Sequence, residues 1–229
     1  EPAPAPGSPH VPASSPARAL LRLAQAAPAT LWATALFALF DTVVLSLLPL
    51  YLQSHGFSTA VALTSASVVL LGDVVMEVPV GWWADRWGVR RVQAGCAAVM
   101  ALCAMAMPWL LPSGPSMGWW LLMGLLGGAA GGIYVLSVTA CGQQFHGLAL
   151  ARMTALLGAA WGAASCAGPA LAGHALGWGG AWSLPGLLMA GACLLLVGLW
   201  WEGLPRASAL RASFGPMARP GSPAPSSSP

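Results

Sequence analysis

Apolar residues along the chain are gathered into long runs and do not alternate with polar residues. Six of these runs reach the length of about 20 residues that a helix needs to cross roughly 30 Å of hydrocarbon. None of them alternates with a period of two, as the strands of a membrane β-barrel do. The pattern therefore predicts an all-α polytopic membrane protein in which six transmembrane helices form one bundle. The expected spans cover residues 30–51, 60–83, 92–111, 117–140, 153–173 and 181–201.

The two ends of the chain differ in composition from the spans between them. Residues 1–27 are rich in Pro, Ala and Ser, and residues 203–229 are rich in Pro, Ser, Ala and Arg. Segments of this composition act as flexible tails or linkers. We therefore expect a transmembrane bundle at 28–202 between two disordered cytoplasmic segments, the first of which is a tail or a central linker. The first apolar run is too long for the apolar core of a signal peptide.

The composition excludes most classes of soluble protein. The 229 residues are 57% hydrophobic and 7% charged, whereas soluble domains carry about 25% charged residues. So few charges cannot cover the surface of a cytosolic enzyme, and they exclude a nucleic-acid-binding module. The five cysteines contain no CxxC pair and no histidine is clustered with them, which argues against disulfides and a metal site. We expect the lipid bilayer as a partner, no nucleic acid and no cofactor.

The positive charges predict an orientation, because all nine belong to Arg and all fall on one side of the expected spans. They precede the first span, follow the sixth, or lie between the second and third or the fourth and fifth. The positive-inside rule then places both termini in the cytoplasm, and we expect a bacterial cytoplasmic (inner) membrane. The nine are Arg18, Arg22, Arg86, Arg90, Arg91, Arg152, Arg206, Arg211 and Arg219.

Tryptophan is concentrated near the ends of the spans, which is typical of the two aromatic belts at membrane surfaces. Trp119 and Trp120 belong to the expected outer belt. Trp161 alone falls in the middle of a span, where it is either a packing residue or the wall of a pocket.

The segment Gly81-Trp-Trp-Ala-Asp-Arg-Trp-Gly-Val-Arg-Arg91 connects the spans at 60–83 and 92–111. Gly81 permits a close helix contact, and Gly88 permits a tight turn. Asp85 is placed to accept hydrogen bonds from the first amides of the next helix, or to pair with an Arg. We expect the arginines of this segment to lie in water. A generic charged loop is the alternative interpretation, which the ordered spacing disfavours.

This segment resembles the signature loop of the major facilitator superfamily, G-x-x-x-D-[RK]-x-G-[RK]-[RK]. The departure is Val89, where a basic residue is usual, and the preceding Glu77-Val-Pro-Val-Gly81 is also similar to the family's second span. The resemblance implies two six-helix bundles that rock against each other, with this loop as a cytoplasmic latch. The latch residues would be Gly81, Asp85, Arg86, Gly88, Arg90 and Arg91.

Two further glycine patterns bear on helix packing. The span at 153–173 resembles the family's G-x-x-x-G-P-x-x-G type of motif through Gly158, Gly162, Gly168, Pro169 and Gly173. Small residues let helices approach closely, and Gly-Pro permits bending. The span at 117–140 carries stripes of glycines at four-residue spacing, which we expect to pack against a neighbouring helix. These are Gly124, Gly128 and Gly132, with Gly127 and Gly131 beside them.

Members of this family normally have twelve spans, so six correspond to one half. The family's N-terminal half often carries an Arg within its fourth span, and the span at 117–140 has none. We therefore expect the C-terminal half. Its partner would be a missing second six-helix half, or a second copy in a homodimer.

Three of the six carboxylates fall inside the expected spans. Asp41 is the deepest, and Asp73 and Glu77 lie four residues apart on one helix face. A charge at a helix centre costs about 2.5–3.5 kcal/mol on insertion scales. We therefore expect these residues to couple substrate or proton movement, with Asp41 first. Asp41 bonded in its neutral form to a hydroxyl, and Glu77 paired with the arginine loop, are the structural alternatives.

The leading functional hypothesis is half of a secondary transporter that moves an unidentified small molecule by alternating access, with proton-coupled efflux. The alternative is a truncated or partner-dependent chain that does not transport alone, because a central site needs both halves. An intramembrane enzyme is the third hypothesis. The chain has no Lys, no HExxH and no GxSxG motif, so we expect no enzyme activity.

Overall fold

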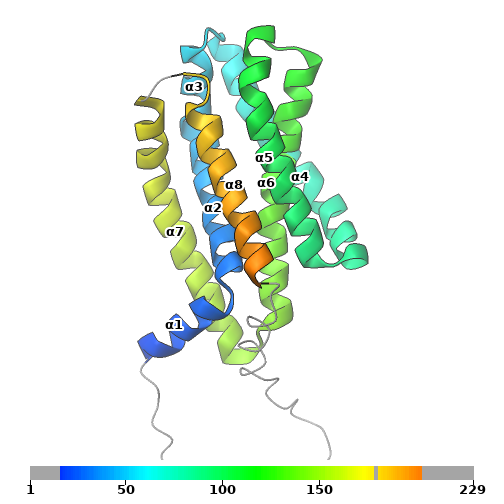
Figure 1. Ribbon diagram of the computed structural model, residues 1–229, viewed down its shortest axis with the longest axis vertical. Helices are drawn as coiled ribbons and strands as arrows, with labels where there is room; N and C mark the ends of the chain where they lie inside the picture. Colours follow the sequence, from blue (N-terminus) through cyan, green and yellow to red (C-terminus); the bar gives the residue numbers. More distant parts are fainter. Residues whose placement is uncertain (1–15, 178–179, 203–229) are drawn as a thin grey trace, which may run out of the picture.

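The computed structural model describes residues 16–177 and 180–202, with side chains from residue 20 onward. Six of the described helices, α2 and α4–α8, are long and apolar enough to cross a membrane, which confirms the all-α six-span prediction (Figure 1). The elements are α1 (Pro16–Ala26), α2 (Pro28–Ser46), α3 (Leu48–Ser54), α4 (Thr59–Trp87), α5 (Val89–Leu110), the 3₁₀ turn η1 (Leu111–Ser113), α6 (Met117–Gln144), α7 (Gly147–Gly177) and α8 (Ser183–Glu202). Residues 1–15 of the tail expected at 1–27, and the whole tail expected at 203–229, lie outside the described residues.

Local capping explains where several of these helices begin. The Ser58 hydroxyl accepts a hydrogen bond from the Val61 amide at 3.4 Å at the start of α4. Ser116 does the same for the Trp119 amide at 3.3 Å at the start of α6. Helices α4 and α7 run past the expected span ends, because a helix continues through polar residues once it leaves the hydrocarbon.

Helix α6 lies at the centre of the bundle. It packs against α4, α5 and α2, while α2 also packs against α7 and α5 against α8. The most apolar part of α6 is 67% buried, compared with 22% for α4 and 17% for α7. Helices α4 and α7 therefore present most of their surface to the outside of this chain.

The contact between α4 and α6 is made by backbone, as the glycine stripes predict. A Cβ atom on Gly127 would overlap the carbonyl oxygen of Val69, and one on Gly72 would overlap that of Gly124. Glycine at these positions lets the two helices approach far more closely than side chains would allow. The glycine stripe of α6 is thus a packing surface.

Helix α1 was not expected, because the sequence of 1–27 suggested a disordered segment. It lies across the foot of the bundle (Figure 1). Leu23 and Ala26 are buried there with Phe145 and Met153 in a second apolar cluster, separate from the main core. Leu21 and Arg22 are exposed. Burial of one apolar face against α6 and α7 explains why this segment is helical.

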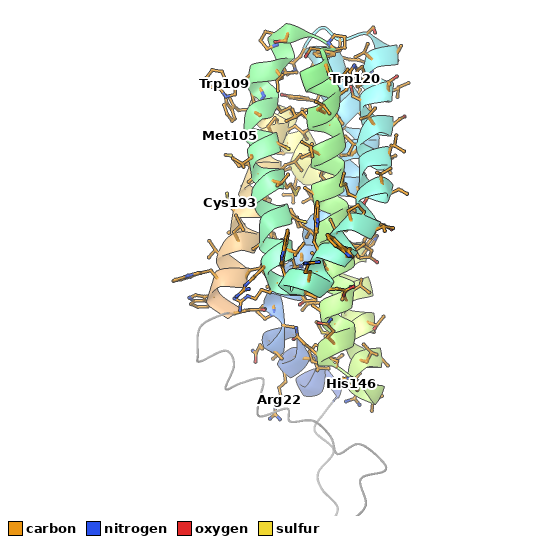
Figure 2. The ribbon with its side chains drawn as sticks, turned by 90° about the vertical axis from the view of Figure 1, so that its right-hand side faces the viewer. Arg22, Met105, Trp109, Trp120, His146 and Cys193 are labelled. Carbon is orange, nitrogen blue, oxygen red and sulfur yellow. The ribbon has the colours of Figure 1, made fainter. Side chains whose placement is uncertain are left out.

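Arginine marks one end of the bundle, called here the arginine end. Arg22, the α4–α5 connection and Arg152 near the start of α7 all belong to it. Figure 2 shows Arg22 and His146 at this end and Trp109 and Trp120 at the opposite one.

Trp119 is not part of the expected aromatic belt. It is fully buried, and its indole N–H donates to the Ser65 hydroxyl at 2.9 Å. The sequence predicted a belt position from the location of Trp119 near the end of a span. Its hydrogen-bond partner, Ser65, lies on another helix, so nothing in the sequence indicated that Trp119 is buried.

We expect Gly127→Ala to destabilise the protein by about 1–3 kcal/mol, because the added methyl forces α4 and α6 apart. SDS-induced unfolding in mixed micelles followed by circular dichroism measures the change. Gly142→Ala is the matched control on the same helix, since nothing lies within 4 Å of a Cβ placed there. The control should be neutral or gain up to about 1 kcal/mol from helix propensity. Equal stability of the two variants would contradict the backbone contact.

Candidate functional site

The three carboxylates inside the spans come from α2 and α4, which both pack against α6, and they lie close enough to interact. Asp73 lies on the face of α4 that meets α6, where its Oδ1 atom contacts the position of Gly131. This oxygen is buried and has no hydrogen-bond partner among the described residues. The carboxyls of Glu77 and Asp41 are the charged groups that interact electrostatically with Asp73. The structure therefore joins three carboxylates that the sequence identified separately.

An aromatic cluster lies beside these carboxylates. The rings of Phe37 and Tyr134 are stacked with centroids 5.0 Å apart. Trp161 lies 5.5 Å from Phe37 and 5.1 Å from Tyr134. Phe37 is one helical turn before Asp41, and Tyr134 is three residues after Gly131, so the cluster occupies the next turn of the same face.

Trp161 is therefore a packing residue that also borders the carboxylate face. Sequence reasoning identified Trp161 as unusual but did not bring Phe37 and Tyr134 to it. These residues come from α2, α6 and α7, and the spacing of residues along the sequence does not show that they meet. The only available signal was that each aromatic side chain lies within an apolar span.

The glycine motif of α7 is divided between two surfaces. Gly168 is buried, and a Cβ atom there would lie 3.6 Å from the Cα of Leu39 in α2. Gly158, Gly162 and Gly173 are exposed, with nothing within 4 Å of an added Cβ. Pro169 lies inside the helix. Among the residues that the structure describes, Gly168 is the one glycine of this motif that packs against another helix, and the other three lie on open surface.

The α4–α5 connection has the turn that the sequence predicted, at Gly88. This residue has φ of 89°, a conformation that glycine adopts readily and other residues rarely. It ends α4 and begins α5 directly. Arg86, Arg90 and Arg91 are exposed, as expected, and the Arg86 guanidinium lies 5.7 Å from the centre of the Trp82 ring.

Two expectations for this connection are wrong within the described chain. Gly81 makes no close helix contact, because nothing lies within 4 Å of a Cβ placed there. Asp85 does not cap α5, whose first turn has no side-chain cap. The tight turn at Gly88 leaves Asp85 in the last turn of α4, where its side chain is exposed.

Neither structural alternative for the carboxylates is seen in the described part of the chain. No hydroxyl there donates a hydrogen bond to Asp41, and no ion pair joins Glu77 to the arginines of the α4–α5 connection. Residues 16–177 and 180–202 also hold no group of three or more His, Cys, Asp or Glu side chains arranged to bind a metal ion.

A sequence profile of the Major Facilitator Superfamily matches residues 30–225. The chain belongs to the Major Facilitator Superfamily. It is an integral membrane protein of a transporter family, which confirms the resemblance carried by the loop and glycine motifs. A comparison with curated proteins finds no match. Membership of the superfamily indicates transport as the general activity. The transported solute depends on the residues of the site.

We expect Asp73 to react with a hydrophobic carbodiimide, a reagent for protonated carboxyls in apolar surroundings. A carboxyl inside a span, with one oxygen buried and without a hydrogen-bond partner, is more stable neutral than charged. Peptide mass spectrometry after labelling in detergent at neutral pH measures modification at each site. Asp85, which is exposed to water, is the internal control and should stay unlabelled. Equal labelling of Asp73 and Asp85 would contradict the apolar environment of Asp73. A complete lack of labelling at Asp73 would contradict it as well.

Proposed function

We propose that this chain is one six-helix half of a secondary transporter, and that its solute moves along the face carrying Asp41, Asp73 and Glu77. The Asp73 Oδ1 atom, which is buried and has no hydrogen-bond partner among the described residues, carries the proposal. Polar groups this unfavourable inside a membrane are retained at substrate and ion pathways. The aromatic rings of Phe37, Tyr134 and Trp161 supply an apolar wall next to the charges.

A second bundle completes the site in this proposal, either as a separate half or as a second copy of this chain. Helices α4 and α7, which flank the carboxylate face, are the least buried of the six spans. The exposed Gly158, Gly162 and Gly173 of α7 provide a smooth surface on which another helix can pack and slide. Transporters of this kind hold their solute between two bundles near the middle of the membrane. By its sequence features the chain corresponds to the C-terminal half.

Protons are the coupling ion in this proposal. A carboxyl facing an apolar environment binds a proton, and the same group facing water releases it. Asp73 would be neutral while packed against Gly131 and would ionise when rocking of the bundles opens the face to water. Export of a solute against inward proton flow is the direction we infer.

The α4–α5 connection would act as the latch between conformations. Its arginines are exposed at the arginine end and free to meet carboxylates or helix C-termini of a second bundle. The unfilled space at Gly81 gives a partner helix room to approach α4. Asp85 and Arg86 would then bind across the interface between bundles, which is why they make no such contacts within this one.

The concentration of arginine at one end supports an inner-membrane orientation with both termini in the cytoplasm. A partner-dependent chain without activity of its own is the second functional hypothesis. The open carboxylate face supports it, because a solute there would not be enclosed by one bundle.

We expect Asp73→Asn and Asp41→Asn to lower proton-coupled transport by about tenfold or more, because an amide cannot take up and release the proton. Proteoliposomes with an imposed pH gradient, a pH-sensitive dye inside and a panel of fluorescent amphiphilic compounds measure the flux. Thr64→Val, an exposed position near the start of the same helix α4, is the control and should transport normally.

The assay is run with the chain alone and together with a separately expressed six-span partner. Transport only in the second case would select the partner-dependent hypothesis. Unchanged transport by Asp41→Asn in an active preparation would remove Asp41 from the coupling mechanism, and unchanged transport by both variants would reject proton coupling through this face.

For topology, we expect Ser54→Cys to react with a membrane-impermeant maleimide from outside the cell, and Arg152→Cys to react only after permeabilisation. The two residues are exposed at opposite ends of the bundle. The exposed Cys166 and Cys193 are first replaced by Ser to remove background labelling. The opposite labelling pattern would invert the orientation.

A further inference from the structure

Helices α4 and α5 leave a groove between them. They meet at Gly88 and then diverge, while both pack against α6. The groove has a volume of about 570 Å³, and the α6 residues Leu125, Gly128 and Ala129 line it between the two helices. Met76 and Val80 of α4 and Val99 of α5 line its sides, so that its long part is apolar. It lies on the other side of the α4–α6 contact from Gly131 and Tyr134.

The groove changes character at the arginine end. Trp83, Trp87 and Arg91 line it there. Trp87 and Arg91 also line a second hollow of about 380 Å³ in the loop region, together with Arg90, Gln143 and Gln144. Glu202 borders this hollow as well, and its Oε1 accepts a hydrogen bond from the Ala29 amide at 2.7 Å. An apolar groove therefore continues into a polar, positively charged hollow, with Arg91 shared by both.

We propose that this groove binds one anionic phospholipid, with an acyl chain along α4 and α5 and the phosphate at Arg90 and Arg91. A phospholipid in a bilayer has an apolar chain, then an ester region, then a phosphate at the membrane surface. This order matches the order of apolar and charged residues along the groove. Basic pockets between transmembrane helices at one membrane surface bind anionic headgroups. Tryptophan rings such as Trp83 and Trp87 are favourable at the depth of the ester region.

Gly95 shows that the groove is open space and not a gap that neighbouring side chains fill. It lines the groove from α5, and nothing lies within 4 Å of a Cβ placed on it. A larger side chain at this position would occupy the groove without displacing protein atoms nearby. Gly186 of α8 is equally open and does not line the groove, so it provides a matched control.

The test measures lipid binding to the purified, delipidated full chain by native mass spectrometry. It is titrated with phosphatidylglycerol and with phosphatidylcholine of the same chains. We expect one bound phosphatidylglycerol and at least about fivefold weaker phosphatidylcholine, since each of the two arginines near the surface attracts an anionic lipid by about that factor. Gly95→Leu should weaken phosphatidylglycerol binding by about tenfold, and Gly186→Leu should not. Arg91→Gln should weaken the headgroup preference, and Arg152→Gln, at the same end but outside the groove, should leave it unchanged.

Equal phosphatidylglycerol binding by Gly95→Leu and Gly186→Leu would overturn the groove. An equal effect of Arg91→Gln and Arg152→Gln, or equal binding of the two lipids by the unaltered chain, would overturn the headgroup site. Glycerol 3-phosphate carries the phosphate without chains, so binding of it as tightly as of phosphatidylglycerol would assign binding to the polar hollow alone and reject the proposal. If Gly95→Leu fails to fold, as judged by circular dichroism, the pair at Arg91 and Arg152 decides, since both side chains are exposed.

Discussion

The backbone contact between α4 and α6 determines where the other features of this protein lie. Because Gly127 and Gly131 have no side chains, α4 lies against α6 at the level of Val69 and Asp73. That approach presses the Asp73 Oδ1 atom against α6 and buries it, while the rest of the side chain is only partly covered. It also holds α4 close to α6 while the tight turn at Gly88 directs α5 away from α4. The carboxylate face and the lipid-sized groove are two consequences of the same contact.

The sequence predicts the membrane fold well because the dominant physical constraint is local. A span must be apolar over its own length, so six runs give six helices. The turn at Gly88 is similarly local, since it depends on one residue's backbone freedom. Expectations failed where the outcome depended on another element. Asp85 does not cap α5, Trp119 is buried by Ser65 of another helix, and α1 is helical because α6 and α7 cover its apolar face.

The candidate site was predicted in part, for a related reason. Asp41, Asp73 and Glu77 stand out in the sequence because charges inside a membrane are unfavourable wherever they occur. Their meeting point depends on α2 and α4 both packing against α6, which no spacing within the chain reveals. The aromatic cluster is a stronger example, since Phe37, Tyr134 and Trp161 come from three helices and become neighbours only when the bundle is packed.

The position of α1 has a consequence for the order in which the protein assembles. Leu23 and Ala26 find their partners at Phe145 and Met153, more than a hundred residues later in the chain. During synthesis, α1 emerges from the ribosome well before these partners exist, so it cannot dock until α6 and α7 have been inserted. Its apolar face then waits at the membrane surface through most of translation. Docking of α1 is therefore a late event that follows completion of the helices above it, although α1 itself is made before all of them.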